Sequence, residues 1–137
     1  MNTYRSQAGM SILGTLIILV MAGFFVMCAL RMGPSYFEYL SVRDIVSRMV
    51  IDPETSGESN NSIRGRLETI FNTNRISGLK AREIEIYRKD GHTYIDAGYE
   101  VRLPIVWRID AVLTFDDLLY RVGQAEPVSP DQAPKKK

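Results

Sequence analysis

The chain has 137 residues, of which 45% are hydrophobic, and its 17 lysines and arginines nearly balance 16 aspartates and glutamates. A formal net charge of +1 argues against a nucleic-acid binder, which must neutralise many phosphates at once. The length leaves room for one membrane span and one small domain of roughly 100 residues. The only cysteine, Cys28, and the only histidine, His92, lie in separate parts of the chain, so neither a disulfide nor a cysteine-histidine pair is predicted.

The N-terminal part of the chain is dominated by one apolar stretch. Residues Ser6 to Leu30 carry no charge and are flanked by Arg5 and Arg31. A helix needs about 20 mainly apolar residues to cross the hydrocarbon core of a bilayer. The stretch is longer than the apolar region of a cleaved signal, and no convincing small-x-small cleavage site follows it. We therefore expect residues 1–32 to hold a retained transmembrane helix.

Three glycines in and beside this stretch are candidate helix-packing positions. Gly9, Gly14 and Gly23 present no side chain, which lets membrane helices approach one another closely. Ordinary span composition explains them equally well. The positive charges on the two sides of the span are nearly equal in number, so charge alone does not decide its orientation.

A second helical pattern follows the span. Gly33 and Pro34 punctuate the chain, and proline is tolerated in a first helical turn, so Pro34 either starts a new helix or bends one long helix. Between Ser35 and Ile51, apolar residues recur at intervals of three and four, which predicts an amphipathic helix. Its apolar face consists of Tyr39, Val42, Ile45, Val46, Met49 and Val50. We expect this face to pack on the domain's own sheet, with a partner helix as the alternative.

A polar segment and a shorter helix come next. Asp52 to Ser62 is rich in turn formers and predicts a mobile loop. Asn61 or Ser62 is expected to cap a helix that ends near Asn74. Its buried face is predicted to contain Ile63, Leu67, Ile70 and Phe71.

From Arg82 onward the apolar period becomes that of strands. Asp90-Gly91 is a strong hairpin-turn signal, and a return strand is predicted over His92–Leu103, with a bulge at Gly98. Pro104 is expected to interrupt the ladder, as prolines do at strand ends or edges.

A third strand is predicted from Val106 or Trp107 to Phe115, and a short fourth strand over Leu118–Val122. Residues 33–122 would thus form a small α+β domain, in which the amphipathic helix packs on an antiparallel sheet. The remaining residues, 123–137, contain three prolines and a terminal lysine run, which predicts a disordered tail.

The sequence contains no recognisable catalytic constellation. His92 lies beside a predicted turn, and Asp116 and Asp117 fit a solvated turn better than an acid-base pair. No serine sits in a nucleophile-elbow pattern, and no glycine-rich phosphate loop follows a strand. We predict no enzymatic activity, no cofactor, no metal and no small-molecule substrate.

Two short motifs resemble those of type IV pilins and pseudopilins. Gly9 to Leu13 (GMSIL) resembles the start of the pilin helix, and Pro34, Tyr36, Glu38 and Tyr39 (PSYFEY) resemble the motif where that helix leaves the membrane. The resemblance implies a long helix packed on an antiparallel sheet, and cleavage after Gly9. Pilins carry glutamate where this chain has Gly14, and the proline lies three residues further on than usual. We therefore expect an uncleaved anchor with pilin-like architecture.

Nearly the whole chain resembles domain-of-unknown-function family 4845. The shared features are the Gly-Met-Ser start, the apolar span, the exit motif Pro-x-Tyr-x-Glu-Tyr, and a late segment like Val101 to Asp110. Members are small bacterial inner-membrane proteins, often encoded next to signal peptidase I. The resemblance implies a cytoplasmic N-terminus and a periplasmic domain.

Two functions are compatible with these features. The first is a membrane-anchored interaction protein, a subunit or scaffold of an envelope assembly, whose partners are the bilayer and a membrane or periplasmic protein, with self-association included. The second is an accessory or modulator subunit of signal peptidase I or another membrane protease.

Overall fold

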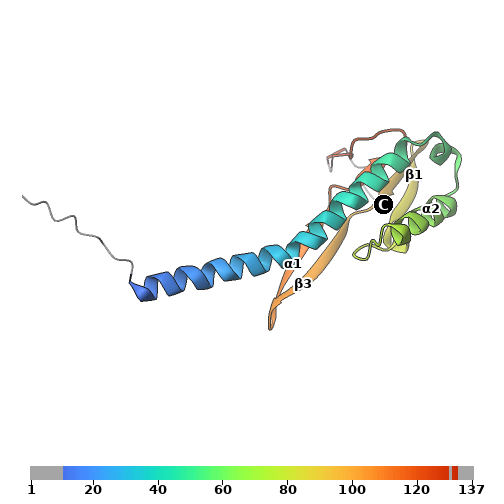
Figure 1. Ribbon diagram of the computed structural model, residues 1–137. Coiled ribbons are helices and arrows are strands. Elements are labelled where there is room, and N and C mark those ends of the chain that lie inside the picture. The colour runs from blue at the N-terminus through green and yellow to red at the C-terminus, as the bar shows by residue number, and fades with distance from the viewer. Residues whose placement is uncertain (1–10, 130, 133–137) are drawn as a thin grey trace, which may run out of the picture.

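The structure of the protein is a computed structural model, which describes residues 11–129 and 131–132. It is an α+β structure with one very long helix, as predicted (Figure 1). The helical elements are α1 (Ile12–Ile51), the 3₁₀ helix η1 (Pro53–Gly57), α2 (Asn60–Thr73) and the 3₁₀ helix η2 (Ala81–Glu83). The strands are β1 (Glu85–Lys89), β2 (His92–Asp96), β3 (Tyr99–Val106), β4 (Ile109–Phe115) and β5 (Leu119–Arg121).

Helix α1 is continuous over 40 residues, with Pro34 inside it. Proline in a helix interior removes one backbone hydrogen bond and favours a kink, and Figure 1 shows α1 changing direction near its middle. Of the two possibilities for Pro34, one long helix is therefore correct. The N-terminal half extends away from the domain and is, by length and composition, a candidate membrane span.

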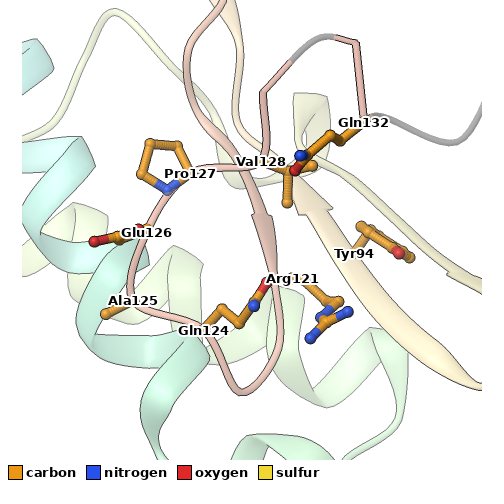
Figure 2. Close-up of a pocket in the computed structure, with 8 residues that line it drawn as sticks. All are labelled: Tyr94, Arg121, Gln124, Ala125, Glu126, Pro127, Val128 and Gln132. Atoms are coloured by element: carbon orange, nitrogen blue, oxygen red, sulfur yellow. The ribbon is translucent and has the colours of Figure 1, made fainter.

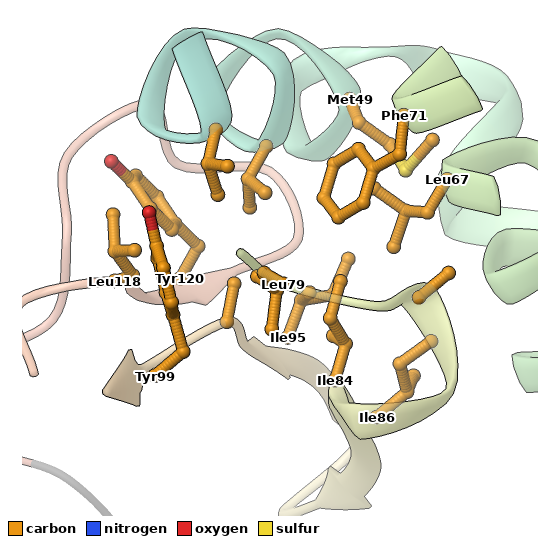
Figure 3. Close-up of a cluster of buried hydrophobic side chains, with 14 of the residues drawn as sticks. Met49, Leu67, Phe71, Leu79, Ile84, Ile86, Ile95, Tyr99, Leu118 and Tyr120 are labelled. Atoms are coloured by element: carbon orange, nitrogen blue, oxygen red, sulfur yellow. The ribbon is translucent and has the colours of Figure 1, made fainter. Parts of the chain in front are cut away.

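The second half of α1 packs against the domain through one face. Val42, Val46 and Val50 are fully buried there, and Ile45 is half-buried. Helix α2 covers the same core with Ile63, Leu67 and Phe71, and Figure 3 shows Leu67 and Phe71 facing side chains that include Ile86 and Ile95 of the strands. The apolar faces predicted for both helices are therefore confirmed.

The segment between the helices is more structured than predicted. It forms η1, in which Thr55 is buried and its hydroxyl donates to the Met49 carbonyl at 2.8 Å. The cap of α2 is Ser59, whose Oγ accepts from the backbone N–H of Ser62 at 3.2 Å. The cap was predicted two or three residues too late, because several neighbouring polar residues can fill that role.

An ion-pair bridge also holds this segment. The Arg66 guanidinium of α2 lies 2.7 Å from a carboxylate oxygen of Asp52 and 3.1 Å from one of Glu58. Its donated hydrogen bond lowers the pKa of Asp52. The bridge ties the first residue of the predicted loop and Glu58, in its second half, to one side chain.

The predicted return strand His92–Leu103 is divided into β2 and β3, which belong to different sheets. One sheet has the order β1-β2-β5, and the other is the β3-β4 hairpin. The break falls at Ala97-Gly98, where the Asp96 carboxylate accepts from the Gly98 N–H at 3.1 Å. A Cβ at Gly98 would lie 3.3 Å from the Phe115 carbonyl oxygen, so glycine permits this crossing. The predicted bulge is thus a change of sheet.

The β3-β4 hairpin differs from the prediction in the position of its turn and in the role of Pro104. Its two-residue turn is Trp107-Arg108, which was assigned to a strand because neither residue is a usual turn former. Pro104 does not end the ladder: it lies within β3 opposite Asp110, and the register shifts between Pro104 and Val106. The shift accommodates the missing proline N–H.

The end of the chain returns along β5, which confirms the predicted fourth strand. The Gly123 N–H donates to the Val50 carbonyl at 2.7 Å, and the Val128 N–H donates to the Leu119 carbonyl at 2.7 Å. Residues 123–128, predicted as part of a disordered tail, are therefore hydrogen-bonded to the domain. Residues 133–137, with the lysine run, lie outside the described residues.

Replacing Leu67 by alanine tests the core. Leu67 is fully buried, so Leu67→Ala should lower the free energy of unfolding by about 2–5 kcal/mol through lost burial and a cavity. Glu68→Ala, on the exposed side of the same helix, is the matched control and should stay within about 0.5 kcal/mol of the wild type. Chemical denaturation of the protein in detergent micelles measures both. Equal stability of the two variants would contradict the core described here.

Candidate functional site

The exit motif lies where α1 leaves the candidate span and meets the domain. Its Glu38 carboxylate reaches the loop between α2 and η2, where Oε1 accepts from the backbone N–H groups of Ser77 and, at 2.6 Å, Gly78. A Cβ at Gly78 would lie 3.4 Å from the Tyr99 ring and 3.5 Å from Glu38 Oε2, which are ordinary van der Waals distances, so the loop packs closely on both side chains. Glu38 therefore docks α1 onto this loop.

Tyr39 makes the second attachment of the motif. Its hydroxyl donates to Asp117 Oδ2 at 2.6 Å, and its ring stacks on Phe115 with centroids 4.5 Å apart. Burial, followed by the hydrogen bond to Asp117, raises the pKa of Tyr39 to about 12. Tyr99 packs on the same Phe115 ring, with centroids 5.1 Å apart. The motif's last tyrosine thus joins α1 to both β3 and the end of β4.

The other side of α1 stays open at the same level. Tyr36, Phe37 and Leu40 are 54%, 70% and 38% exposed, and Pro34 is also exposed. We call Tyr36, Phe37 and Leu40 the exit face. The residues of the motif therefore have different roles: Glu38 and Tyr39 attach the helix to the domain, whereas the Tyr36 ring is about half exposed and lies beside the Tyr39 ring, with centroids 5.7 Å apart. Phe37 and Leu40 were not predicted as site residues. The sequence does contain a signal for them, because both are large apolar residues that fall outside the buried face of the helix.

Two of the predicted glycine positions, Gly14 and Gly23, are open within the described residues. A Cβ at Gly14 or Gly23 would meet no heavy atom within 4 Å. Both lie on the projecting half of α1, where helix packing remains a prediction. Gly9, and with it cleavage after this residue, lies outside the described residues.

The hollows on the domain surface are open to solvent, and their linings mix polar and apolar side chains. Figure 2 shows one of about 480 Å³ between β2, β5 and the C-terminal segment. Its lining consists of Tyr94, Arg121, Gln124, Ala125, Glu126, Pro127, Val128 and Gln132. In the described part of the chain, no group of three or more histidine, cysteine, aspartate or glutamate side chains is placed to hold a metal ion. The exit face is therefore the candidate functional site with the clearest chemistry, which is apolar contact.

Comparison with known proteins identifies one relationship. The family model described as "Domain of unknown function (DUF4845)" matches residues 31–115. The match begins at the end of the apolar stretch and includes the exit motif, α2 and the strands through β4. No curated protein and no solved structure matches the chain.

Removing the Glu38 carboxylate tests the first attachment. Glu38→Ala leaves the N–H groups of Ser77 and Gly78 without this acceptor and should cost about 1–3 kcal/mol of unfolding free energy. Glu38→Gln keeps one acceptor oxygen and should cost less. Hydrogen exchange should speed up at Ser77 and Gly78 in the alanine variant. Wild-type exchange at these two amides would show that Glu38 does not dock the loop.

Alkaline pH tests the second attachment. Because the folded-state pKa of Tyr39 is about 12 against an ordinary 10, the stability from its neutral hydroxyl is complete below pH 10 and is lost as the pH rises toward 12. The wild type should therefore lose more thermal stability than Tyr39→Phe over this interval. Melting of both proteins in the same detergent at matched pH values gives the comparison. Parallel pH profiles would refute the assigned role of the hydroxyl.

Proposed function

Because the chain belongs to the DUF4845 family, whose function is unknown, we propose from its own structure that it is a non-enzymatic, single-pass inner-membrane protein that binds other proteins. Its N-terminus would be cytoplasmic, and its pilin-like domain would stand in the periplasm as a subunit or scaffold of an envelope assembly. The observation that carries the proposal is the exit face, which continues the apolar surface of α1 above the candidate span.

The length of the apolar half of α1 supports a span. From Ile12 to Leu30 the helix extends about 27 Å at about 1.5 Å per residue, close to the roughly 30 Å of a hydrocarbon core. Large side chains on this half are mostly exposed within the chain, from Ile12 at 90% to Leu30 at 72%. Exposing so much apolar surface to water is unfavourable, and lipid would cover it.

The height of the exit face favours protein over lipid as its partner. Phe37 lies about 10 Å further along the helix than Leu30, at about 1.5 Å per residue. The headgroup region adds only roughly 5–7 Å beyond each side of the hydrocarbon core. With α1 upright, the Phe37 ring would stand above the lipid, and a cluster of exposed apolar side chains there is typical of a protein contact. A helix of a neighbouring subunit presents a suitable surface.

The uses of the polar side chains support a binding protein rather than an enzyme. Glu38 accepts from backbone amides, Asp117 accepts from Tyr39, and Arg66 bridges Asp52 and Glu58. Each of these groups stabilises the attachment of one element to another. Such groups hold a surface in place, which is what a scaffold requires.

Photo-cross-linking in living cells tests the proposed partner surface. A benzoylphenylalanine at Phe37, which preserves an aromatic side chain, should capture a second copy of the chain or one other membrane protein. The same photoreactive residue at Glu68, on the exposed side of α2, is the matched control. Two differently tagged copies distinguish self-association from a different partner. A C-terminal alkaline phosphatase fusion, expected to be active, checks the orientation in the same strain.

Each outcome of that experiment is informative. Capture of signal peptidase I at Phe37 in stoichiometric yield would favour the accessory-subunit alternative. Protein products at Phe37 no more abundant than at Glu68 would contradict an exit-face partner. An inactive phosphatase would contradict the periplasmic placement.

A further inference from the structure

The β3-β4 hairpin carries a second exposed apolar patch. Apart from those on α1, the large hydrophobic side chains that the described residues leave exposed are all on this hairpin. They are Val106 at 44%, Trp107 at 96%, Ile109 at 68% and Val112 at 48%. We call Val106, Trp107 and Ile109, which surround the turn, the hairpin tip.

One contact places the hairpin relative to the candidate span. The Arg31 guanidinium, at the end of the apolar stretch, donates to the Pro104 carbonyl of β3. Further from the span, Tyr99 at the start of β3 lies with Phe115 beside Tyr39 of α1. Strand β3 therefore runs toward the N-terminal end of α1, and the hairpin lies beside the middle of that helix in Figure 1.

The hairpin tip consequently reaches past Arg31 toward the candidate span. Trp107 is three residues beyond Pro104, which is up to about 10 Å at roughly 3.3 Å per residue of strand. Arg31 marks the edge of the apolar stretch, where a membrane interface begins. The tip thus lies at the depth of the boundary between headgroups and acyl chains, whereas the exit face lies on the other side of Arg31.

The backbone at Trp107 provides an independent indication. Its φ is 47°, in the left-handed region that bulky residues avoid. It is the first residue of a two-residue hairpin turn, a position at which a positive φ favours glycine. Folding alone would be served better by glycine or asparagine, and an indole that is 96% exposed makes little contact within the chain. Strain of this kind at an exposed aromatic residue points to a function outside the fold.

The polar groups of the hairpin suit an interface of this kind. Arg108, beside Trp107 in the turn, has a long stem and can place its guanidinium among phosphates. Asp110 pairs with Pro104 and so stays level with Arg31, outside the apolar zone. Tryptophan itself is enriched at membrane interfaces because it combines an apolar ring with one hydrogen-bond donor.

We propose that the hairpin tip inserts into the headgroup-acyl boundary of the same membrane, as a second anchor that fixes the tilt and rotation of the domain. This inference rests on the proposed membrane span. Lipid is favoured over a protein occupant because the patch is level with the end of the apolar helix. Two anchors at one interface, α1 and the tip, restrict rotation of the domain about the helix axis, which a single span does not.

The sequence offers a direct probe, since Trp107 is the only tryptophan. Full-length protein is placed in vesicles of phosphatidylcholine with a minority of anionic phosphatidylglycerol. Some of the vesicles contain phosphatidylcholine brominated near either the carbonyl or the methyl end of its chains. Compared with a tryptophan placed in β1 by Tyr87→Trp, Trp107 should have blue-shifted emission and should be several-fold less quenched by aqueous iodide. Its emission should also be quenched more by shallow than by deep bromines.

Two relocated reporters distinguish the possible failures. Trp107→Phe combined with Phe25→Trp places the probe in the span, and combined with Tyr87→Trp places it in β1, far from the membrane. If the Phe25→Trp probe escapes deep bromines, the span itself is wrong. If that probe is quenched while Trp107 behaves like the Tyr87→Trp probe, only the hairpin anchor is overturned. Shielding of Trp107 from iodide without bromine quenching would indicate a protein occupant and also overturn the lipid anchor.

A further variant tests whether Trp107 serves the fold instead. Asparagine tolerates a positive φ, so Trp107→Asn should keep or raise the thermal midpoint of the protein in detergent. Hydrogen exchange of residues 105–110 should nevertheless increase in vesicles, because the interfacial contact is lost. A lowered midpoint in detergent, or unchanged exchange in vesicles, would overturn the proposal.

Discussion

The structure depends on one continuous helix whose two halves differ in what surrounds them within the chain. The N-terminal half of α1 is apolar on every side and exposed within the chain, whereas the second half buries one face in the domain. The change occurs between Arg31 and Ser35, where a charge, a glycine and a proline follow one another. Because the helix is continuous there, any orientation adopted by its first half is transmitted to the domain. The position of the domain, which packs on the second half of α1, is therefore set by the direction of the first half.

The contacts around the exit motif fix how α1 is oriented against the rest of the domain. Glu38 binds the α2–η2 loop, Tyr39 binds Asp117 and stacks on Phe115, and Arg31 holds the Pro104 carbonyl. These contacts lie on the docked side of α1 and set the rotation of the helix against both sheets. The exit face is open because the opposite side is occupied. The hairpin tip lies near the end of the candidate span because β3 runs along α1 toward the N-terminus of the helix, from Tyr99 beside Tyr39 to Pro104 beside Arg31.

The two proposed contact surfaces lie on opposite sides of the end of the apolar stretch, measured along α1. This difference in position is why we assign a protein partner to one surface and lipid to the other. Phe37 lies beyond Arg31 in the direction of the domain, while Trp107 lies beyond Pro104 in the direction of the span. A scaffold that binds a neighbour with one face benefits from a fixed rotation about its membrane helix. The two proposals are therefore mechanically compatible, although each depends on separate residues.

The sequence by itself determined the elements whose signals are local. The apolar stretch, the buried faces of α1 and α2, the Asp90-Gly91 turn and β5 all follow from composition and period, because burial repeats with the geometry of the helix or strand. Family membership likewise follows from the sequence, as does the exit motif itself. Gly14 and Gly23 can be read as packing positions, but in the described part of the chain a Cβ at either would meet no atom within 4 Å.

Only the tertiary structure decided how the strands divide and which polar residues act as attachments. The split between β2 and β3 depends on Gly98 passing close to the Phe115 carbonyl, a contact distant in sequence. The turn at Trp107-Arg108 is held by the pairing of β3 with β4 against the local preference of a tryptophan. Glu38 and Tyr39 have different roles from Tyr36 because helix rotation is set by long-range contacts. Local patterns record which side chains avoid water, whereas the choice of partner depends on residues that only folding brings together.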